Sequence, residues 1–442
     1  MSLPFVSDAP CHPAADNADG LFQQSGGFSH ALAPASVALS RLDEYNRPVV
    51  FGKTTPADSA AQPSDIRTVR AIGDPTGKEG VTDMDILTYL QEASTQFGPS
   101  GHEYAIAEWY KKRFEPLCDT VTIDPLFNVL ATLKPTVKPA RGGHAPRILL
   151  CAHMDEIALM VADILKDGSL RMGNVGGVDP RILPAATVTV HGHTAAGKPA
   201  PLSGVVGAKA PHLLNDEEKK QNYKREDLYV DLGLPVEKVK KLVHVGDLIT
   251  LNGRTVGLQN GRAAGKTMDD RACIGVMLEA AERLQKMQHA SEIVFACTAQ
   301  EEVGIRGAKT AAFNVDPDLA VIMDVSHAPI PASRPDTTVP LDAPAATYGP
   351  RIQYKLLARL LDTAKQHGIA LNTEQAESYT GTDTDAVQIG RAGIPCVLID
   401  LPLKYMHTTV ELLDTNALRE CGRLVAHFTA EIDEGWDDEL WI

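Results

Sequence analysis

Residues 293–302, Ile-Val-Phe-Ala-Cys-Thr-Ala-Gln-Glu-Glu, form an apolar run that ends in two adjacent carboxylates. The run predicts a strand buried on both faces, as parallel strands in α/β sheets are, and Val303-Gly304 predicts a turn directly after it. Glu301 and Glu302 would then lie at the carboxyl end of a strand, the edge at which open α/β sheets bind ligands. Two ionised side chains repel each other there unless cations neutralise them or one carries a proton. Taken alone, the pair could also be a solvated loop after a core strand.

Length and composition indicate a globular protein with more than one structural unit. A chain of 442 residues is long enough for two or three units, since domains average roughly 150 residues. Hydrophobic residues make up 44% and charged residues 22%, which is typical of soluble globular proteins. The formal charge of −15 comes from 42 Lys and Arg against 57 Asp and Glu, and no basic patch stands out. We therefore expect neither nucleic acid nor an anionic membrane as a partner.

The seven cysteines indicate a reducing compartment. No Cys-x-x-Cys pair occurs, and Cys151, Cys297 and Cys396 lie inside apolar, strand-like runs. This pattern is typical of buried free thiols rather than of a disulfide framework. The sequence does not open on a basic segment followed by an apolar stretch, and no window approaches the roughly 18 apolar residues of a membrane span. We expect a cytoplasmic protein.

Residues 1–80 form an N-terminal extension rich in Ala, Ser, Pro, Asp and Gly, with a more structured pattern at 37–51. An extension that is mobile or drapes over the body is favoured over a dedicated interaction arm, and we assign it no chemistry. The pattern changes at Thr82, the predicted N-cap of a helix whose apolar face begins at Ile86. A second helix and three strands are expected next, over residues 103–114, 121–123, 129–133 and 148–152.

The strand at 148–152 is followed by His153-Met154-Asp155-Glu156. Residues two apart in a strand point the same way, so His153 and Asp155 share a face. A histidine whose ring is oriented by a carboxylate is a common arrangement at metal sites. A histidine that is hydrogen-bonded in a core is the alternative.

Between residues 160 and 255 the pattern changes to short β-type runs separated by Gly, Pro and Asn. Runs at this spacing predict a small barrel or sandwich, which we place as an inserted domain at 161–254. The catalytic domain would then comprise 81–160 and 255–442. The histidines of the insert show no tight ligand spacing, so we favour surface or structural roles for His191, His193, His212 and His244.

The α/β pattern returns with Asp269-Asp270-Arg271 before a helix expected at 275–284; this charged turn could be a helix cap. A helix is expected at 306–312, and a buried strand at 319–323 ends in Asp324. A helix at 354–367, a tight loop at 380–383 and a strand at 396–399 should follow, and the strand leads to His407. Thr408 or Thr409 is the predicted cap of the final helix.

Strand ends and loops thus supply one set of candidate site residues, namely His153, Asp155, Asp269, Glu301, Glu302, Asp324 and His407. Imidazole with carboxylate suits zinc, cobalt or manganese, and an excess of carboxylate suits two ions that share a bridging Asp. A single zinc ion needs only three protein ligands and would leave several carboxylates unexplained. One carboxylate must accept the proton of the attacking water, so either Glu301 or Glu302 should be a base.

Over residues 82–432 the chain resembles the tetrahedral (TET) metallo-aminopeptidases, which include glutamyl, lysyl, leucyl and deblocking enzymes. The matching motifs occur in order: Gly98-Pro99-Ser100-Gly101-His102-Glu103, His153-Met154-Asp155-Glu156, Lys209-Ala210-Pro211-His212, Asp269-Asp270-Arg271, Gln300-Glu301-Glu302-Val303-Gly304, Gly381-Thr382-Asp383 and Tyr405-Met406-His407. Phe127 stands where the family usually has Gly, and Lys404 where it usually has Arg.

The resemblance implies a role for each candidate residue. His153 and Asp324 would bind one divalent metal ion, Glu302 and His407 the other, and Asp269 both. Glu301 would be the general base that deprotonates a water bridging the two ions. Asp155 would support His153 from behind.

The resemblance also implies the fold and the assembly. We expect an α/β/α sandwich with a mixed, largely parallel sheet, plus an inserted small β-barrel-like domain. The insert would build dimers and, through them, a dodecamer. The expected activity is metal-dependent removal of the N-terminal residue from short peptides, with two divalent ions per subunit, zinc first and cobalt or manganese as alternatives.

Two other functions are alternatives to an aminopeptidase. A metal-dependent amidohydrolase of the deacetylase, desuccinylase or carboxypeptidase type has a similar ligand pattern. Its extra domain typically follows the Glu-Glu pair, whereas here the long spacer lies between His153 and Asp269. A catalytically silent scaffold is the second alternative, and the complete ligand set with an intact Glu301 argues against it.

Overall fold

The computed structural model describes residues 84–140, 143–438 and 440, which belong to one compact unit of the chain, Glu79–Ile442. The predictions for residues 1–80, including the patch at 37–51, lie outside the described residues. In the part of the chain that is described, no helix is long and apolar enough to span a membrane. The six cysteines within it are all free thiols.

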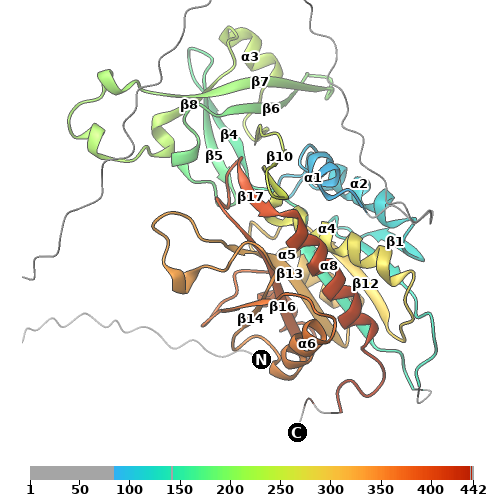
Figure 1. Ribbon diagram of the computed structural model, residues 1–442. Coiled ribbons are helices and arrows are strands. Elements are labelled where there is room, and N and C mark those ends of the chain that lie inside the picture. Colours follow the sequence, from blue (N-terminus) through green and yellow to red (C-terminus); the bar gives the residue numbers. More distant parts are fainter. Residues whose placement is uncertain (1–83, 141–142, 439, 441–442) are drawn as a thin grey trace, which may run out of the picture. The chain divides into compact units, whose positions relative to one another are not determined.

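The body of the structure is a mixed sheet of eight strands in the order β1-β2-β12-β3-β13-β16-β14-β15 (Figure 1). Its strands are β1 (Thr120–Ile123), β2 (Val129–Leu133), β3 (Arg147–His153), β12 (Glu292–Thr298), β13 (Leu319–His327), β14 (Ala345–Tyr348), β15 (Asn372–Gln375) and β16 (Cys396–Leu403). The four central strands, β12, β3, β13 and β16, run parallel to one another. Almost all of their side chains are buried, which explains why they appear in the sequence as continuous apolar runs.

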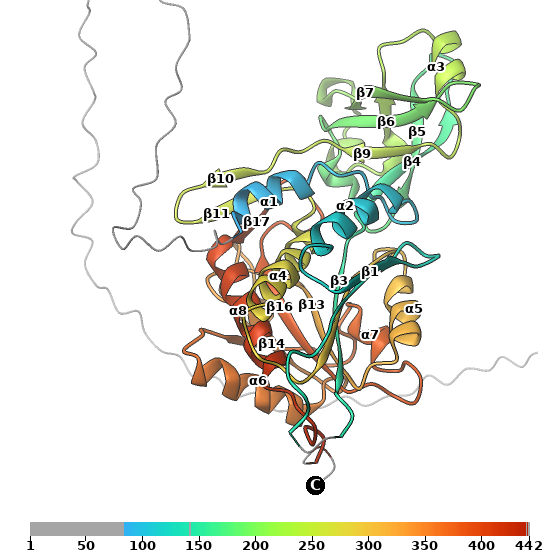
Figure 2. The ribbon, with the colours of Figure 1, turned by 90° about the vertical axis from the view of Figure 1, so that its right-hand side faces the viewer.

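Helices cover both faces of this sheet, with α4, α6 and α8 on one side and α5 and α7 on the other (Figure 2). The helices are α1 (Ile86–Ala93), α2 (Tyr104–Phe114), α3 (Val236–Leu242), α4 (Met268–Leu284), α5 (Arg306–Val315), α6 (Tyr354–Gln366), α7 (Thr384–Val387) and α8 (Thr415–Ala430). The N-cap of α1 is Asp85, so the prediction of Thr82 as its cap is wrong. Asp satisfies the first backbone N–H groups of a helix as well as Thr does.

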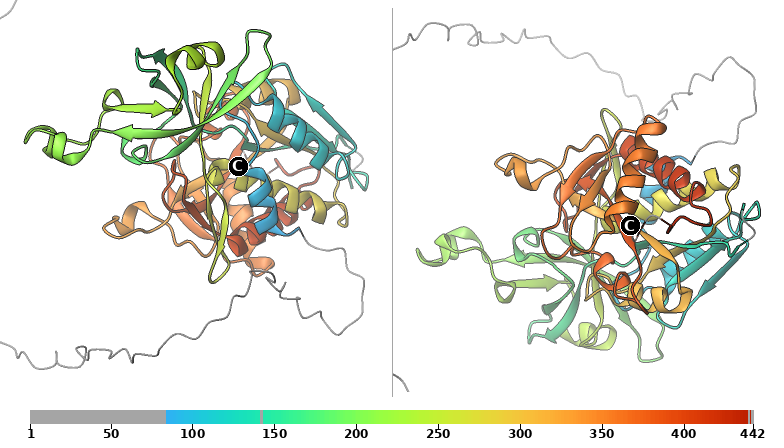
Figure 3. Two further views of the ribbon diagram at one scale, coloured as in Figure 1. Left: turned by 90° about the horizontal axis from the view of Figure 1, so that it is seen from above. Right: turned by 90° about the horizontal axis from the view of Figure 1, so that it is seen from below.

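Six further strands close into an antiparallel barrel in the order β4-β5-β8-β7-β6-β9, grouped apart from the sheet (Figure 3). They are β4 (Ala158–Ile164), β5 (Leu170–Val175), β6 (Thr187–His193), β7 (Pro199–Ala208), β8 (Leu228–Asp231) and β9 (Leu248–Leu251). The barrel encloses an apolar core of its own. Together with the layered sheet, it confirms the predicted fold class. The exact domain limits stay predictions.

A small sheet of β10 (Val256–Leu258), β11 (Arg262–Gly265) and β17 (Glu411–Asp414) corrects one helix prediction. The final helix is not capped by Thr408 or Thr409, because β17 lies between His407 and α8. Asp414, the last residue of β17, caps α8 by accepting a hydrogen bond from the Asn416 N–H at 2.8 Å. A strand of only four residues that pairs with the distant β11 leaves little signal in the sequence.

Strand register brings polar residues to one edge of the large sheet. β12 and β3 pair with Thr298 opposite His153, and β13 and β16 pair with Asp324 opposite Asp400. The carboxyl ends of parallel strands meet at one edge, so residues that follow these strands collect there. The fold therefore places the predicted site residues in one region.

The start of α5 approaches the end of β12 so closely that only glycine fits at position 307. A Cβ atom on Gly307 would lie 2.3 Å from the carbonyl oxygen of Ala299 and 2.3 Å from Oδ1 of Asn128. The Asn128 amide donates to the Gly307 carbonyl at 3.1 Å, and its Oδ1 accepts from the Ala299 N–H at 2.9 Å. This clamp fixes the segment that leads to Glu301 and Glu302.

Replacing Gly307 by Ala is expected to lower the free energy of unfolding by about 1–3 kcal/mol, because the added methyl group must push apart the backbone and the Asn128 clamp. Denaturant unfolding measures the change. Gly207→Ala in β7 is the matched control, since a Cβ atom there meets nothing closer than 4.0 Å. Equal losses in the two variants would show that the close approach at position 307 is not the cause.

Candidate metal centre

His153 is the last residue of β3, and the buried Asp155 lies behind it. The Asp155 carboxylate accepts hydrogen bonds from the Glu301 N–H at 3.0 Å, the Glu302 N–H at 3.3 Å and the Ser100 hydroxyl at 2.6 Å. Its Oδ1 lies 3.4 Å from Nδ1 of His153. Asp155 thus orients the imidazole so that Nε2 faces the centre, and it also holds the backbone of the Glu-Glu pair.

Asp269 lies between two imidazoles. Its Oδ1 is 3.0 Å from Nε2 of His153, and its Oδ2 is 3.2 Å from Nε2 of His407. Glu302 Oε1 is 3.3 Å from the same nitrogen of His407. The peptide bond between Asp269 and Asp270 is cis. A carboxylate with one oxygen toward each imidazole is arranged to bridge two cations.

Glu301 and Asp324 complete the set. Oε2 of Glu301 lies 3.9 Å from Nε2 of His153. Two groups of potential ligand atoms each lie within 4.8 Å of one another, namely His153 with Asp269 and Glu302, and His153 with Asp270 and Asp324. The structure thus brings together all seven residues selected from the sequence. Their individual roles stay predictions.

Three more buried carboxyl groups border the centre and received no role from the sequence. Both oxygens of Asp270 are buried and lack a hydrogen-bond partner among the described residues. Asp383 accepts a hydrogen bond from the Thr298 hydroxyl at 2.5 Å, and Glu411 accepts one from the His407 N–H at 2.8 Å. Asp270 and Asp383 occur inside motifs quoted in the sequence analysis, and this position is the signal that could have identified them. Glu411 lies in β17, a strand that the sequence analysis did not predict.

Arg271 is fully buried, so the alternative of an exposed, charged helix cap does not hold for it. Its guanidinium donates to the carbonyl oxygens of Ala93 at 2.8 Å and Gln96 at 3.0 Å. It also pairs at 3.2 Å with the Glu156 carboxylate, which Lys266 contacts at 2.6 Å. This buried network ties the segment after β3 to the start of α4, the two segments that carry His153 and Asp269.

The electrostatics of the centre reveal an excess of negative charge. Burial raises the pKa of Glu301 to about 8, raises the pKa of Asp324 well above its ordinary value, and raises the pKa of Glu302. The carboxylates of Asp269 and Glu302 raise the pKa of His407 to about 11. These buried carboxyl groups therefore require either protons or cations to neutralise them.

The residues present fit a pair of divalent cations. Imidazole and carboxylate are the donors that zinc, cobalt and manganese accept, and both buried oxygens of Asp270, which have no hydrogen-bond partner among the described residues, are available as ligand atoms. Nδ1 of His407 lies 3.0 Å from the Gly177 carbonyl oxygen, the kind of second contact that orients a metal-binding histidine. A cavity of about 1080 Å³ lined by Glu301, Asp324 and other residues of the centre gives a substrate access.

Comparison of the sequence with known proteins identifies relatives that are peptidases. A family model described as M42 glutamyl aminopeptidase matches residues 136–424. The lysyl aminopeptidase of Pyrococcus furiosus is 35% identical over 358 residues, covering 80% of this chain and 98% of that protein.

Two solved structures show the same fold. A TET aminopeptidase from a marine sediment thaumarchaeote superposes with a TM-score of 0.74 at 31% identity, covering 80% of this chain and 98% of that one. The Pyrococcus horikoshii TET1 peptidase, which can assemble into a tetrahedron or a large octahedral shell, superposes with a TM-score of 0.67 at 28% identity, covering 78% and 100% of the two chains.

Asp155→Asn keeps the shape of the side chain but removes the negative charge behind His153. We expect divalent-cation affinity to fall about 10- to 100-fold, as it does when the group that orients a metal-binding histidine is lost. Competition with a chromophoric chelator measures the affinity. Asp216→Asn is the control, because the Asp216 side chain is 93% exposed. Unchanged affinity in a folded Asp155→Asn protein would remove Asp155 from the support of the centre.

Proposed function

Because the chain belongs to the M42 glutamyl aminopeptidase family, we propose that it removes the N-terminal residue from short peptides with two divalent cations and with Glu301 as the general base. The family supports the coarser statement directly: the chain is a peptidase. The cation pair and the role of Glu301 are inferred from the centre described above.

His153 and Asp324 would hold one cation, Glu302 and His407 the other, and Asp269 both. The position of Asp269 between the two imidazoles supports this division. When bound, the cations polarise the scissile carbonyl and lower the pKa of a shared water molecule. Zinc is the first choice for this donor set, with cobalt and manganese as alternatives.

Glu301 and Glu302, the adjacent carboxylates that follow β12, have different neighbours. The proposal rests on this difference. Both residues line the cavity, but Glu302 lies 3.3 Å from His407, whereas Glu301 reaches no imidazole nitrogen of the described residues closer than 3.9 Å. Glu301 is therefore the carboxylate left free to accept the proton of the attacking water and deliver it to the leaving amine. Asp155 holds the backbone N–H groups of both residues, so the two side chains keep their separate directions.

The amidohydrolase and scaffold alternatives receive less support. The family match and the aminopeptidase relatives cover most of the chain, including the barrel between His153 and Asp269. A silent scaffold would have no need for the buried, mutually repelling carboxylates of the centre, which reduce stability unless they are neutralised.

We extend the proposal to self-association through the barrel, as a dimer that builds a dodecamer. The Pyrococcus horikoshii TET1 peptidase forms closed shells, and this chain covers that whole protein. The barrel also exposes large apolar side chains, including Val205 at 50% and Leu213 at 61%. Exposed apolar side chains of this kind are frequent at interfaces between subunits.

We further propose that the cavity prefers a basic N-terminal residue. Asp400 on β16 and Glu374 on β15 line it and share Thr347, whose hydroxyl donates to Asp400 at 2.6 Å and lies 3.3 Å from Glu374. Among the described residues, neither carboxylate forms an ion pair with Lys or Arg. A substrate ammonium or guanidinium group would supply the missing positive charge. The Pyrococcus furiosus relative is a lysyl aminopeptidase, which agrees with this preference.

Glu301→Gln is expected to lower kcat about 10²- to 10⁴-fold, because the general base is lost while the cation ligands remain. Mass spectrometry of a short peptide and its N-acetylated twin follows stepwise N-terminal trimming, and elemental analysis reports bound metal. Glu302→Gln is the control, since it should reduce metal content as well as turnover. Normal turnover by Glu301→Gln would exclude Glu301 as the base, and loss of the acetyl group would favour the amidohydrolase.

Glu374→Gln is expected to lower the ratio of kcat/KM for a lysyl substrate over a leucyl substrate about tenfold, since Glu374 is half-buried and a hydrogen bond to a charged group contributes about 1.5–3 kcal/mol. Matched lysyl and leucyl 4-nitroanilides give the ratio. Glu377→Gln is the control, because Glu377 lines the same cavity but is exposed. A wild-type enzyme that favours the leucyl substrate would overturn the proposed preference while leaving the aminopeptidase function intact.

A further inference from the structure

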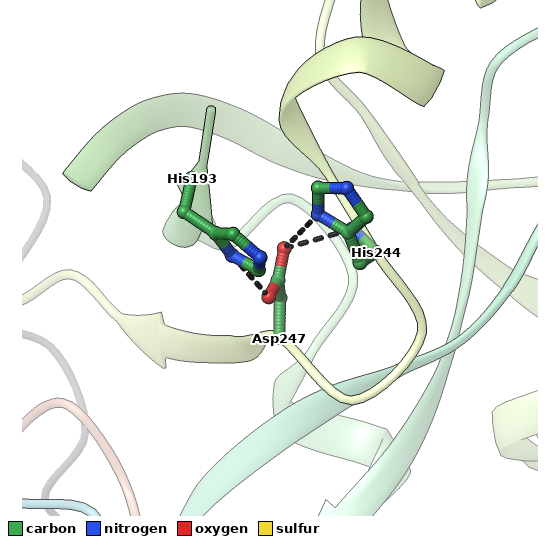
Figure 4. A group of neighbouring side chains, drawn as sticks. All are labelled: His193, His244 and Asp247. Atoms are coloured by element: carbon green, nitrogen blue, oxygen red, sulfur yellow. Dashed lines mark hydrogen bonds and ion pairs between the residues drawn. The ribbon is translucent and has the colours of Figure 1, made fainter. Parts of the chain in front are cut away.

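We propose that His193, His244 and Asp247 form a binding site for a divalent transition-metal ion such as Zn²⁺ on the barrel, separate from the catalytic centre. Figure 4 shows the two imidazoles on either side of the Asp247 carboxylate. The three residues offer ligand atoms that all lie within 4.8 Å of one another. Two histidines and one carboxylate are a common ligand set for zinc in proteins.

Strand pairing and one tight turn bring these residues together. β6 pairs antiparallel with β9, with Val190 opposite Ile249, so the end of β6 at His193 lies beside the turn that precedes β9. That turn is closed by the Asp247 N–H, which donates to the His244 carbonyl at 3.1 Å. The backbone on both sides is thus fixed before any ion binds.

The distances match those required by a shared ion. Nδ1 of His193 lies 3.1 Å from Oδ1 of Asp247, and Nδ1 of His244 lies 3.7 Å from Oδ2 of the same carboxylate. Ligand atoms about 2.0–2.1 Å from a tetrahedral zinc ion are about 3.3 Å apart. The observed separations lie on either side of that value. The two rings stack, with centroids 4.2 Å apart and an interplanar angle of 24°, so the imidazoles would have to rotate for a nitrogen of each to face one ion.

Polar groups at this cluster are left unsatisfied by the protein alone. Nδ1 of His244 is buried and has no hydrogen-bond partner among the described residues, although the ring is 42% exposed. The Asp247 side chain is only 9% exposed, and its ion pairs in the described part of the chain are with the two imidazoles and with no Lys or Arg. The carboxylate already accepts the His244 N–H at 2.8 Å, so Nδ1 of His244 is the atom whose missing partner a cation would supply.

A comparable cluster elsewhere lacks this property. His367, His427 and Glu431 also lie close together, but none of their side-chain nitrogen or oxygen atoms is buried without a hydrogen-bond partner, since Glu431 is engaged by His367 at 2.8 Å and by the Thr363 hydroxyl at 2.7 Å. An ion there would have to displace existing hydrogen bonds. The barrel cluster is therefore the one that we assign to a metal.

The test counts bound metal on the full-length chain. Wild type, His193→Gln, His244→Gln and Asp247→Asn are loaded with excess ZnCl₂, desalted and analysed by mass spectrometry for zinc per chain. Asp247→Asn retains an oxygen that can accept the His244 N–H, which now donates to the carboxylate at 2.8 Å, so the turn is preserved. His144→Gln, at an exposed histidine outside the barrel, is the matched control.

We expect each of the three cluster variants to hold one zinc ion fewer per chain than wild type and His144→Gln. Circular dichroism checks that every variant is folded. Peptide turnover should be the same in all of them, which separates this site from the proposed catalytic centre. Equal zinc content in folded wild type and cluster variants would overturn the proposal.

Discussion

Negative charge concentrated at one edge of the large sheet is the constraint on which the rest of the site depends. Carboxylates lie there within or just after the parallel strands, with Asp324 inside β13 and Glu301 and Glu302 after β12, and burial raises their pKa values. Among the residues that the structure describes, only the imidazoles of His153 and His407 offset this charge within the centre. The fold accepts an arrangement that is unfavourable for the protein alone and favourable once cations are present. The proposed metal-dependent function rests on that balance.

Supporting groups keep these mutually repelling side chains in place. Asp155 accepts hydrogen bonds from the backbone of both Glu301 and Glu302 and also orients His153, so one carboxylate positions three residues of the centre. Arg271, buried behind them, pairs with Glu156 and binds backbone carbonyl groups. The backbone that carries the centre is therefore held by hydrogen bonds to buried side chains, while His153, Asp269 and Glu302 present potential ligand atoms within 4.8 Å of one another.

The residues that the sequence singled out lie together in the structure, whereas several buried carboxyl groups around them received no role from the sequence. His153, Asp324 and Glu302 follow or end apolar runs, and strand ends are visible from one-dimensional patterns. Asp270 lies beside a predicted residue, yet its complete burial depends on packing from several distant segments. Clusters assembled across a barrel are still harder to predict from sequence. His193 and His244 lie 51 positions apart, and only strand register brings them together.

Phe127 shows how a departure from the family pattern can be understood from the structure. Its φ of +71° lies in the left-handed region, which explains why the family usually has glycine there. A side chain in that conformation costs about 1–2 kcal/mol. The Phe127 ring is only partly exposed to solvent, because it packs edge-on against Tyr104, with ring centroids 6.4 Å apart. This contact offsets part of the backbone cost.

Similar left-handed residues surround the metal centre itself. Thr267, Gln300 and His407 have φ of +63°, +58° and +60°, and each is a proposed ligand or lies within two residues of one. Such conformations persist only where the surroundings over-determine them. Here buried carboxylates supply that restraint, since Glu103 accepts the Gln300 N–H at 3.0 Å and Glu411 accepts the His407 N–H at 2.8 Å. Glu103 and Glu411, which received no role from the sequence, thus hold the backbone at Gln300 and His407 in left-handed conformations beside the proposed ligands.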